Sequence, residues 1–299
     1  MRTRIALILP ARLSTALLWP MMLVLGATLL VGGAAYAWWA EGHGAVAEAA
    51  TTALPEDMPR FFRASGKALY HMSGDPDRWK NPQAKHLRAA EAPDHFIDLE
   101  DFQGRELPQD RWKAIALLQE LKVKPDIVGF LPYAIMENYD RLTVAFYDYR
   151  KDKDNPIIQH KCVVYAGVLA HLTGDCVMPL HTTRDYDGRL DAKTGKKLQK
   201  GIHAKIDAFP ERHGITAEEM NRGIKARKID DVWKHVLERI QESHALVGKC
   251  YEIDREGGFD KPNKESRAFI LARCRTGAQF TADLWYSAWL RSEKLPPHW

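Results

Sequence analysis

Apolar residues recur at helical spacing over most of the chain that follows residue 38. In Asp230–Ile253 the residues Val232, Val236 and Ile240 follow one face of a helix, and Glu265–Trp289 is a second amphipathic stretch. Alternating patterns typical of β-strands are scarce. The sequence therefore predicts an all-α fold in a single domain. Further helices are expected over residues 42–54, 110–121 and 131–149.

A long apolar run from Ile157 to Met178 predicts a helix at the centre of this domain. Asn155 is a good N-cap residue, and Pro156 suits the first helical position because its missing N–H is not needed there. Pro179 closes the run.

Composition supports a folded core and narrows the class of protein. The chain has 299 residues, of which 45% are hydrophobic and 27% are charged, which excludes disorder as its main state. Its formal net charge is +4, and Arg2, Arg4 and Arg12 account for three of these charges. A strongly basic nucleic-acid-binding coat is therefore excluded. The mean hydropathy of −0.37 excludes a polytopic membrane protein.

The N-terminus has the pattern of an export signal. Residues 13–40 carry no charge, and Ala35-Tyr36-Ala37 matches the small-residue pattern of a signal-peptidase site. We expect residues 1–37 to be a cleaved signal peptide, Trp38 to be the first mature residue, and the protein to be periplasmic or secreted. The alternative is an uncleaved membrane anchor, although Pro20 disfavours it.

Four cysteines in an exported protein suggest two disulfides. Cys162 and Cys176 fall on one predicted helix about 21 Å apart, too far for a bond with each other. We expect them to bridge to Cys250 and Cys274, in either order. The alternative is four buried free thiols.

Histidine and aspartate carry the candidate chemistry. His171 and Asp175 lie one helical turn apart, His203 and Asp207 repeat this spacing, and His181 follows a proline that must end the helix. Each pair alone is more often a surface ion pair. Together, nitrogen and oxygen donors without cysteine suit a hydrolytic zinc site better than a structural zinc site.

The segment Ala170-His171-x-x-Gly174-Asp175-x-x-x-Pro179-Leu180-His181 resembles the signature helix of the trinuclear-zinc phosphodiesterases. This superfamily joins the bacterial zinc-dependent phospholipases C with the single-strand nucleases of the S-one/P-one type. The resemblance extends over almost all of residues 38–290, and it is closest to bacterial phospholipase C-like proteins. The other matching positions are Trp38, Gly42-His43, Asp77, His95-Phe96-x-Asp98, His203 and Asp207.

The resemblance implies a helical phospholipase C/nuclease-type fold that holds three zinc ions in one cleft. It assigns to the first zinc ion Asp77, His95, His171 and Asp175. It assigns to the second the amine and carbonyl of Trp38, with His43 and a bridging Asp175. It assigns to the third His181, His203 and Asp207. The remaining histidines are expected to be non-ligands: His71, His86, His160, His213, His235, His244 and His298.

The resemblance also implies a mechanism. A hydroxide between the two closer zinc ions attacks phosphorus, and the third zinc ion and Lys80 stabilise the developing charge. Asp77 orients the nucleophile, and Asp175 bridges the metals. Asp75 competes with Asp77 for its role, and Lys80 has the alternative of being a solvated surface lysine.

The sequence features that bear on the substrate are divided between the phospholipase branch and the nuclease branch of the superfamily. Glu41 stands where the phospholipases place a choline-contacting carboxylate, and the segment Gly201–Asp207 resembles their G-x-H-x-K motif. The short spacing from Trp38 to His43, an aspartate at position 207 and Lys80 resemble the nucleases instead. Further candidate substrate-binding residues, present in both branches, are Phe96 and Asp98.

We expect an exported zinc-dependent phosphodiester hydrolase with a phospholipase C-type substrate favoured. The alternatives are a single-strand nuclease or 3'-nucleotidase, and a non-catalytic zinc-binding envelope protein. The expected partners are a phospholipid headgroup or single-stranded nucleic acid, with transient membrane-surface contact and no obligate protein partner. The connection between His181 and His203 has a net charge of +3, which suits attraction of such anions. The interpretation that we favour for this connection is nevertheless a solvated, flexible loop.

Overall fold

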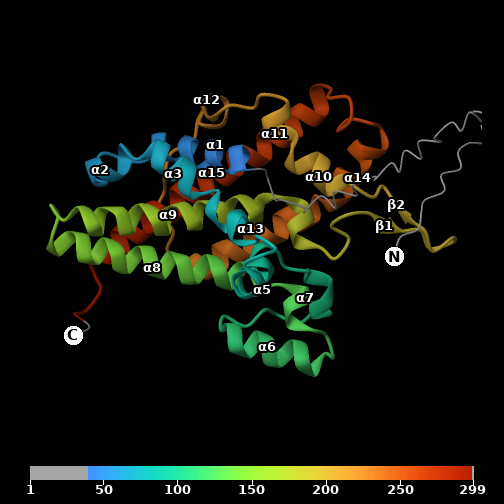
Figure 1. The fold of residues 1–299 in the computed structure, drawn as a ribbon, viewed down its shortest axis with the longest axis horizontal. Helices are drawn as coiled ribbons and strands as arrows, with labels where there is room; N and C mark the ends of the chain where they lie inside the picture. The colour runs from blue at the N-terminus through green and yellow to red at the C-terminus, as the bar shows by residue number, and fades with distance from the viewer. Residues whose placement is uncertain (1–39, 298–299) are drawn as a thin grey trace, which may run out of the picture. The chain divides into compact units, whose positions relative to one another are not determined.

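A computed structural model describes residues 40–297 of the chain. Over this range the structure consists of helices, short 3-10 turns and one small β-hairpin, which confirms the all-α prediction (Figure 1). The predicted signal peptide, its cleavage site and Trp38 lie outside the described residues. Between residues 40 and 297, no helix has both the length and the apolar character that a membrane span requires.

Three long helices form the centre of the fold. Helices α8 (Leu131–Lys151) and α9 (Pro156–Val177) run side by side, and α15 (Lys264–Ser292) packs against both (Figure 1). Helix α1 (Ala40–Thr52) contacts α9 and α15. The predicted capping of α9 is confirmed, because the side chain of Asn155 accepts a hydrogen bond from the amide of Ile157 at 3.0 Å.

Shorter elements surround this centre. The short helices before α8 are α2 (Arg60–Arg63), α3 (Gly66–Met72), α4 (Asp75–Trp79), α5 (Lys85–Glu91), α6 (Arg111–Glu120) and α7 (Pro125–Val128). Those after α9 are α10 (Ile202–Asp207), α11 (Phe209–Arg212), α12 (Ala217–Met220), α13 (Val232–Ala245) and α14 (Val247–Arg255). The 3-10 turns are η1 (Ala92–His95), η2 (Leu99–Phe102) and η3 (Pro179–Thr182).

A two-stranded antiparallel hairpin follows η3. Strand β1 (Arg189–Leu190) pairs with β2 (Lys197–Leu198), so that Arg189 faces Leu198 and Leu190 faces Lys197. The hairpin occupies the connection between His181 and His203 that the sequence marks as basic.

One predicted helix is divided in the structure. The stretch Asp230–Ile253 forms α13 and α14, with Leu246 between them. The amide of Leu246 bonds to the carbonyl of Ser243, three residues earlier, which tightens the last turn and redirects the chain. The break lets Val236 pack in the core around α8 and α9 while Val247 packs in a second apolar cluster.

The expected disulfides are absent from the described residues, and this prediction is wrong. All four cysteines are free, buried thiols. Cys162 and Cys176 lie on α9 as predicted, but they pack in the core cluster around α8 and α9. Cys250 and Cys274 pack in the second cluster. The two pairs therefore belong to different parts of the core, where the thiols act as small apolar side chains.

Candidate metal centre

Six segments of the fold bring eight of the predicted ligands into one buried centre. His171 and Asp175 come from the middle of α9, and shorter elements close around them. The other side chains are His43 from α1, Asp77 from α4, His95 from η1, His181 from η3, and His203 and Asp207 from α10. Each of the eight residues is at most 7% exposed.

The carboxylate of Asp175 lies at the middle of this centre. Its Oδ2 is 3.0 Å from Nδ1 of His95 and 3.2 Å from Nε2 of His171. Its Oδ1 is 3.3 Å from Nδ1 of His181 and 3.5 Å from Nε2 of His43. One buried carboxylate thus faces four imidazoles from four different elements, which is the arrangement expected of a bridging ligand.

The side chains form three groups that could each hold a metal ion, with ligand atoms within 4.8 Å of one another. The groups are His43, His171 and Asp175; Asp77, His95 and His171; and His181, His203 and Asp207. The third group contains the residues that the resemblance assigns to one zinc ion. The first two groups share His171, whereas the resemblance assigns His171 only to the first zinc ion, with Asp77, His95 and Asp175.

Backbone carbonyls orient two of the imidazoles. Nδ1 of His171 donates to the carbonyl oxygen of Ser73 at 2.7 Å, and Nδ1 of His181 donates to that of His95 at 2.7 Å. Each bond leaves Nε2 with its lone pair directed into the centre, as in histidines that bind metals. Nε2 of His181 then lies only 3.1 Å from Nε2 of His203. A cation between two such nitrogens would satisfy both.

The centre also contains buried polar atoms without a hydrogen-bond partner. Among the described residues these include both ring nitrogens of His43, Nδ1 of His203 and Oδ1 of Asp207. Such atoms are rare in folded proteins because each costs free energy when it is left unpaired. Nitrogen and oxygen donors of this kind are ordinary zinc ligands. The donor set therefore fits zinc.

Burial and neighbouring charges set the protonation states of these groups. Burial lowers the pKa of His43, and burial together with Lys80 lowers that of His95 to about 3. Burial alone would raise the pKa of Asp175, but His171 and His181 hold it well below its usual range. Neutral imidazoles and an ionised carboxylate are the forms that bind metal.

Two imidazoles retain their protons more strongly. Burial lowers the pKa of His171 and His203, but Asp175 and Asp207 respectively raise each above its usual value. A metal ion must displace these protons when it binds, so protons compete with metal at both positions.

Asp75 and Asp77, the two candidates for one ligand position, have different partners in the structure. Nζ of Lys80 lies 2.6 Å from Oδ1 of Asp77, and the lysine side chain is 14% exposed. Asp75 instead forms an ion pair with Arg78 at 2.6 Å. Of the two aspartates, Asp77 is therefore the one that faces the imidazoles, and Lys80 accompanies it.

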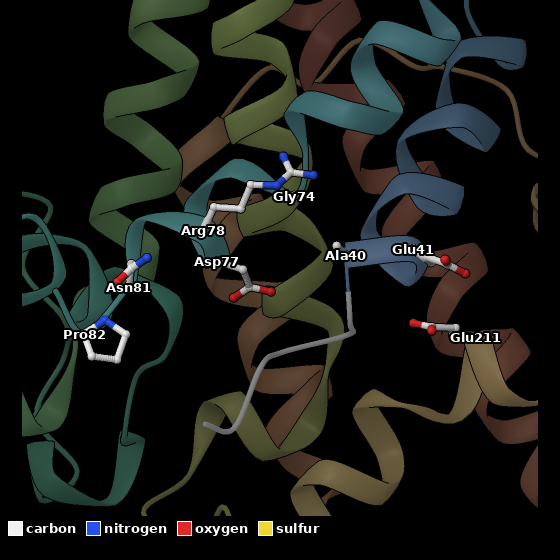
Figure 2. Close-up of a pocket in the computed structure, with 8 residues that line it drawn as sticks. All are labelled: Ala40, Glu41, Gly74, Asp77, Arg78, Asn81, Pro82 and Glu211. Atoms are coloured by element: carbon white, nitrogen blue, oxygen red, sulfur yellow. The ribbon is translucent and has the colours of Figure 1, made fainter. Parts of the chain in front are cut away.

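A cavity of about 520 Å³ opens beside Asp77. Figure 2 shows Glu41 and Glu211 near one another on one side of this cavity, with Asp77 across from them. Glu211, on the four-residue helix α11, was not identified in the sequence. Burial and the nearby Glu41 raise the pKa of Glu211. The cavity thus places two acidic groups next to the metal centre.

Phe96 and Asp98 do not line this cavity. The carbonyl of Phe96 accepts a hydrogen bond from the amide of Leu131 at 3.1 Å, so its backbone joins η1 to α8. Asp98 is buried, and burial together with Asp101 and Glu100 raises its pKa to about 8. Their role in substrate binding stays a prediction.

The histidines expected to be non-ligands lie outside the three groups wherever the structure describes them. They are His71, His86, His160, His213, His235 and His244; His298 is not described. Two contacts were missed from the sequence. Ser73 acts through its carbonyl alone, and the ring of Tyr186 lies 5.6 Å from that of His203. Neither type of contact leaves a signal in residue spacing.

No protein-family model matches the sequence, and no curated protein matches it. Solved structures with some likeness include alpha-toxin from an avian strain of Clostridium perfringens, with a TM-score of 0.48 and 14% identity over 87% of this chain and 67% of that one. Alpha-toxin from Clostridium absonum gives a TM-score of 0.42 and 16% identity over 84% of this chain and 63% of that one. The chain thus spans less than two thirds of the second toxin's length.

Proposed function

We propose that this protein is an exported zinc-dependent phosphodiester hydrolase whose favoured substrates are phospholipids, cleaved as by a phospholipase C. The observation that carries the proposal is the position of Asp175, whose two carboxylate oxygens face four buried imidazoles. Three groups of ligands meet around it. A structural zinc site needs only one such group.

Zinc ions held by these groups would supply Lewis-acid chemistry and activate water near neutral pH. Asp77 and Lys80 are placed for complementary roles. The Asp77 carboxylate lies where it can orient the attacking water, at the edge of both the imidazole cluster and the cavity. The Lys80 ammonium group lies next to it and can stabilise negative charge on the phosphate oxygens.

The acidic side of the cavity favours a substrate with a cationic group. Glu41 and Glu211 would attract the ammonium of a choline or ethanolamine headgroup while its phosphodiester reaches Asp77. A carboxylate pair repels the anionic phosphodiester backbone of a nucleic acid. This electrostatic contrast is the reason for preferring the phospholipid.

A single-strand nuclease or 3'-nucleotidase is the second candidate. The ion pair of Lys80 with Asp77 favours it, because a cation at this position resembles the phosphate-binding lysine of the nuclease branch. The aspartate at position 207 is a further feature of that branch.

Export and removal of the leader belong to the same proposal. Cleavage after Ala37 would free the amine of Trp38, close in sequence to His43, and a free amine can bind zinc where an amide cannot. We propose that Trp38 completes the ligand set of the His43 group.

The test is parallel turnover of phosphatidylcholine and single-stranded DNA by the zinc-loaded exported protein. The proposal predicts release of phosphocholine at a rate well above DNA cleavage, and loss of both activities in the Asp175→Asn variant. Faster DNA cleavage would support the nuclease instead. Activity on neither substrate, nor on a simple aryl phosphodiester, would contradict the hydrolase.

A further inference from the structure

The connection between His181 and His203 forms a structured projection, which we call the basic hairpin (residues 184–200). Tyr251 of α14 fixes its base. The Tyr251 hydroxyl accepts a hydrogen bond from the amide of Gly188 at 2.8 Å and donates one to the carbonyl of Asp185. The guanidinium of Arg189 lies 4.2 Å from the centre of the Tyr251 ring. The base of the hairpin is therefore held in place, while most of its residues are exposed to solvent, as expected of a solvated loop.

The basic hairpin exposes large apolar side chains. Leu190 is 71% exposed, Leu198 is 49% exposed and Tyr186 is 46% exposed. Leu190 and Lys197 are opposite partners in the strand pair, so their side chains leave the hairpin on the same face. Nζ of Lys197 also lies 5.4 Å from the centre of the Tyr186 ring. An aromatic, an aliphatic and a cationic side chain thus share one solvent-facing surface.

The acidic residues of the hairpin serve its own structure. Asp187 accepts a hydrogen bond from the amide of Gly201 at 2.6 Å, and Asp191 accepts bonds from the backbone of the turn. The lysines are different: within residues 40–297, no carboxylate lies at ion-pair distance from Lys193, Lys196, Lys197 or Lys200. Their charges are therefore not neutralised by carboxylates of the described residues, although the Lys197 ammonium also lies near the ring of Tyr186.

This surface begins at the metal centre. The ring of Tyr186 meets that of His203 edge-on, with 5.6 Å between their centres. Figure 1 shows β1 and β2 extending beyond α10, the helix that carries His203. Any surface that contacts the hairpin is therefore brought to the edge of the candidate catalytic centre.

We propose that the basic hairpin docks the protein onto a lipid surface that contains anionic phospholipids. Leu190 enters the boundary between headgroups and acyl chains, Tyr186 lies at headgroup level, and the lysines contact the anionic headgroups. A polyanion such as nucleic acid would use the lysines but would gain nothing from an exposed leucine. This inference rests on the proposed function, since docking presents lipid phosphodiesters to the centre beside it.

The test measures flotation of the full chain with phosphatidylcholine vesicles that contain or lack phosphatidylglycerol. The Leu190→Ser variant should bind both kinds of vesicle about tenfold less. The double variant Lys193→Gln/Lys196→Gln should lose binding only to the anionic vesicles, by about fivefold for each lysine. Neither change should alter turnover of a soluble aryl phosphodiester.

Matched controls lie at the connection of α8 and α9, on the opposite side of the view in Figure 1. Ile157 is 75% exposed there, and Lys151 and Lys153 are exposed nearby. Ile157→Ser and Lys151→Gln/Lys153→Gln should bind vesicles like the unchanged protein. Equal vesicle binding by the hairpin variants and the control variants would overturn the inference. Hairpin variants that lost binding to single-stranded DNA but kept their binding to vesicles would overturn it as well.

Flotation separates this inference from the proposed function. Vesicle binding that depends on the hairpin, without phospholipid hydrolysis, would support docking and contradict the substrate. Hydrolysis of vesicle lipid that is unchanged in the hairpin variants would support the substrate and contradict docking.

Discussion

Gly174 lies so close to His43 that a Cβ atom at position 174 would be 2.7 Å from Nδ1 of the imidazole. The His43 ring in turn stacks on His171, with 3.8 Å between ring centres. The glycine of the His171-x-x-Gly174-Asp175 pattern is therefore a packing requirement of the centre. It lets α1 bring a ligand against α9.

Gly174→Ala should displace His43 and weaken the zinc site to which it belongs. We expect a loss of about 1–3 kcal/mol of unfolding free energy from overpacking. We also expect a lower zinc content per chain and reduced phosphodiesterase activity. Calorimetry and elemental analysis measure the two effects.

Gly248→Ala is the matched control, because Gly248 also lies in a helix but has open space around it. Alanine there should raise stability by about 0.5–1 kcal/mol and leave zinc unchanged. If the two variants had the same stability and zinc content, the close approach of Gly174 to His43 would not be needed for zinc binding.

Asp98 should make the protein less stable as pH rises. Its pKa in the fold is about 8, against 3.8 as the ordinary value, because burial and neighbouring acids favour the neutral form. Between these values the folded state retains a proton that the unfolded state has lost, so stability falls with increasing pH. Asp98→Asn removes this ionisation. Its melting temperature should fall less between pH 5 and pH 8 than that of the unchanged protein.

The melting comparison has a control in Asp126→Asn, since Asp126 is an exposed aspartate that does not contribute to the raised pKa of Asp98. A pH dependence unchanged in Asp98→Asn would show that Asp98 ionises normally in the fold.

Glu41 and Glu211 should determine the preference for a cationic headgroup. Glu41→Gln and Glu211→Gln each remove a negative charge from the cavity, so KM for phosphatidylcholine should rise in both variants and most in the double variant. Turnover of an aryl phosphodiester without a cationic group should change little. Steady-state kinetics on the two substrates provide the measurement.

Glu56→Gln serves as the control, because Glu56 is an exposed acid that does not line the cavity. Equal losses on both substrates, or none on either, would remove the electrostatic reason for preferring a phospholipid.

Helices with strong local signals could be predicted from the sequence. The N-cap at Asn155, the proline at 156 and the apolar run after it all act within a few residues, and the structure contains that helix. The division at Leu246 could not be predicted, because no proline marks it and the nearby glycine, Gly248, lies inside α14 rather than at the break. Packing of Val247 into a second cluster decides it. Whether the cysteines form disulfides or remain free thiols likewise depends on the cluster in which each cysteine packs.

Most of the candidate centre could be predicted from the sequence, because its ligands lie at fixed spacings on short segments. His171 with Asp175 and His203 with Asp207 each occupy one turn of helix. The position of Glu211 beside the centre could not be predicted, since a single glutamate on a four-residue helix has no distinctive sequence neighbours. Its approach to Glu41 depends on how distant segments pack.

Zinc stoichiometry of the exported protein is the measurement that bears most closely on a centre with three metal ions. The protein would be purified after export, with intact mass establishing its N-terminus, and its metal content measured by elemental analysis. We expect three zinc ions per chain, close to two in Asp207→Asn, and a larger loss in Asp175→Asn because its carboxylate lies between the groups. His244→Gln, outside the three groups, should retain all three. A protein that binds no zinc, or one whose zinc content is unaffected by Asp175→Asn, would show that these side chains do not form a zinc centre around Asp175.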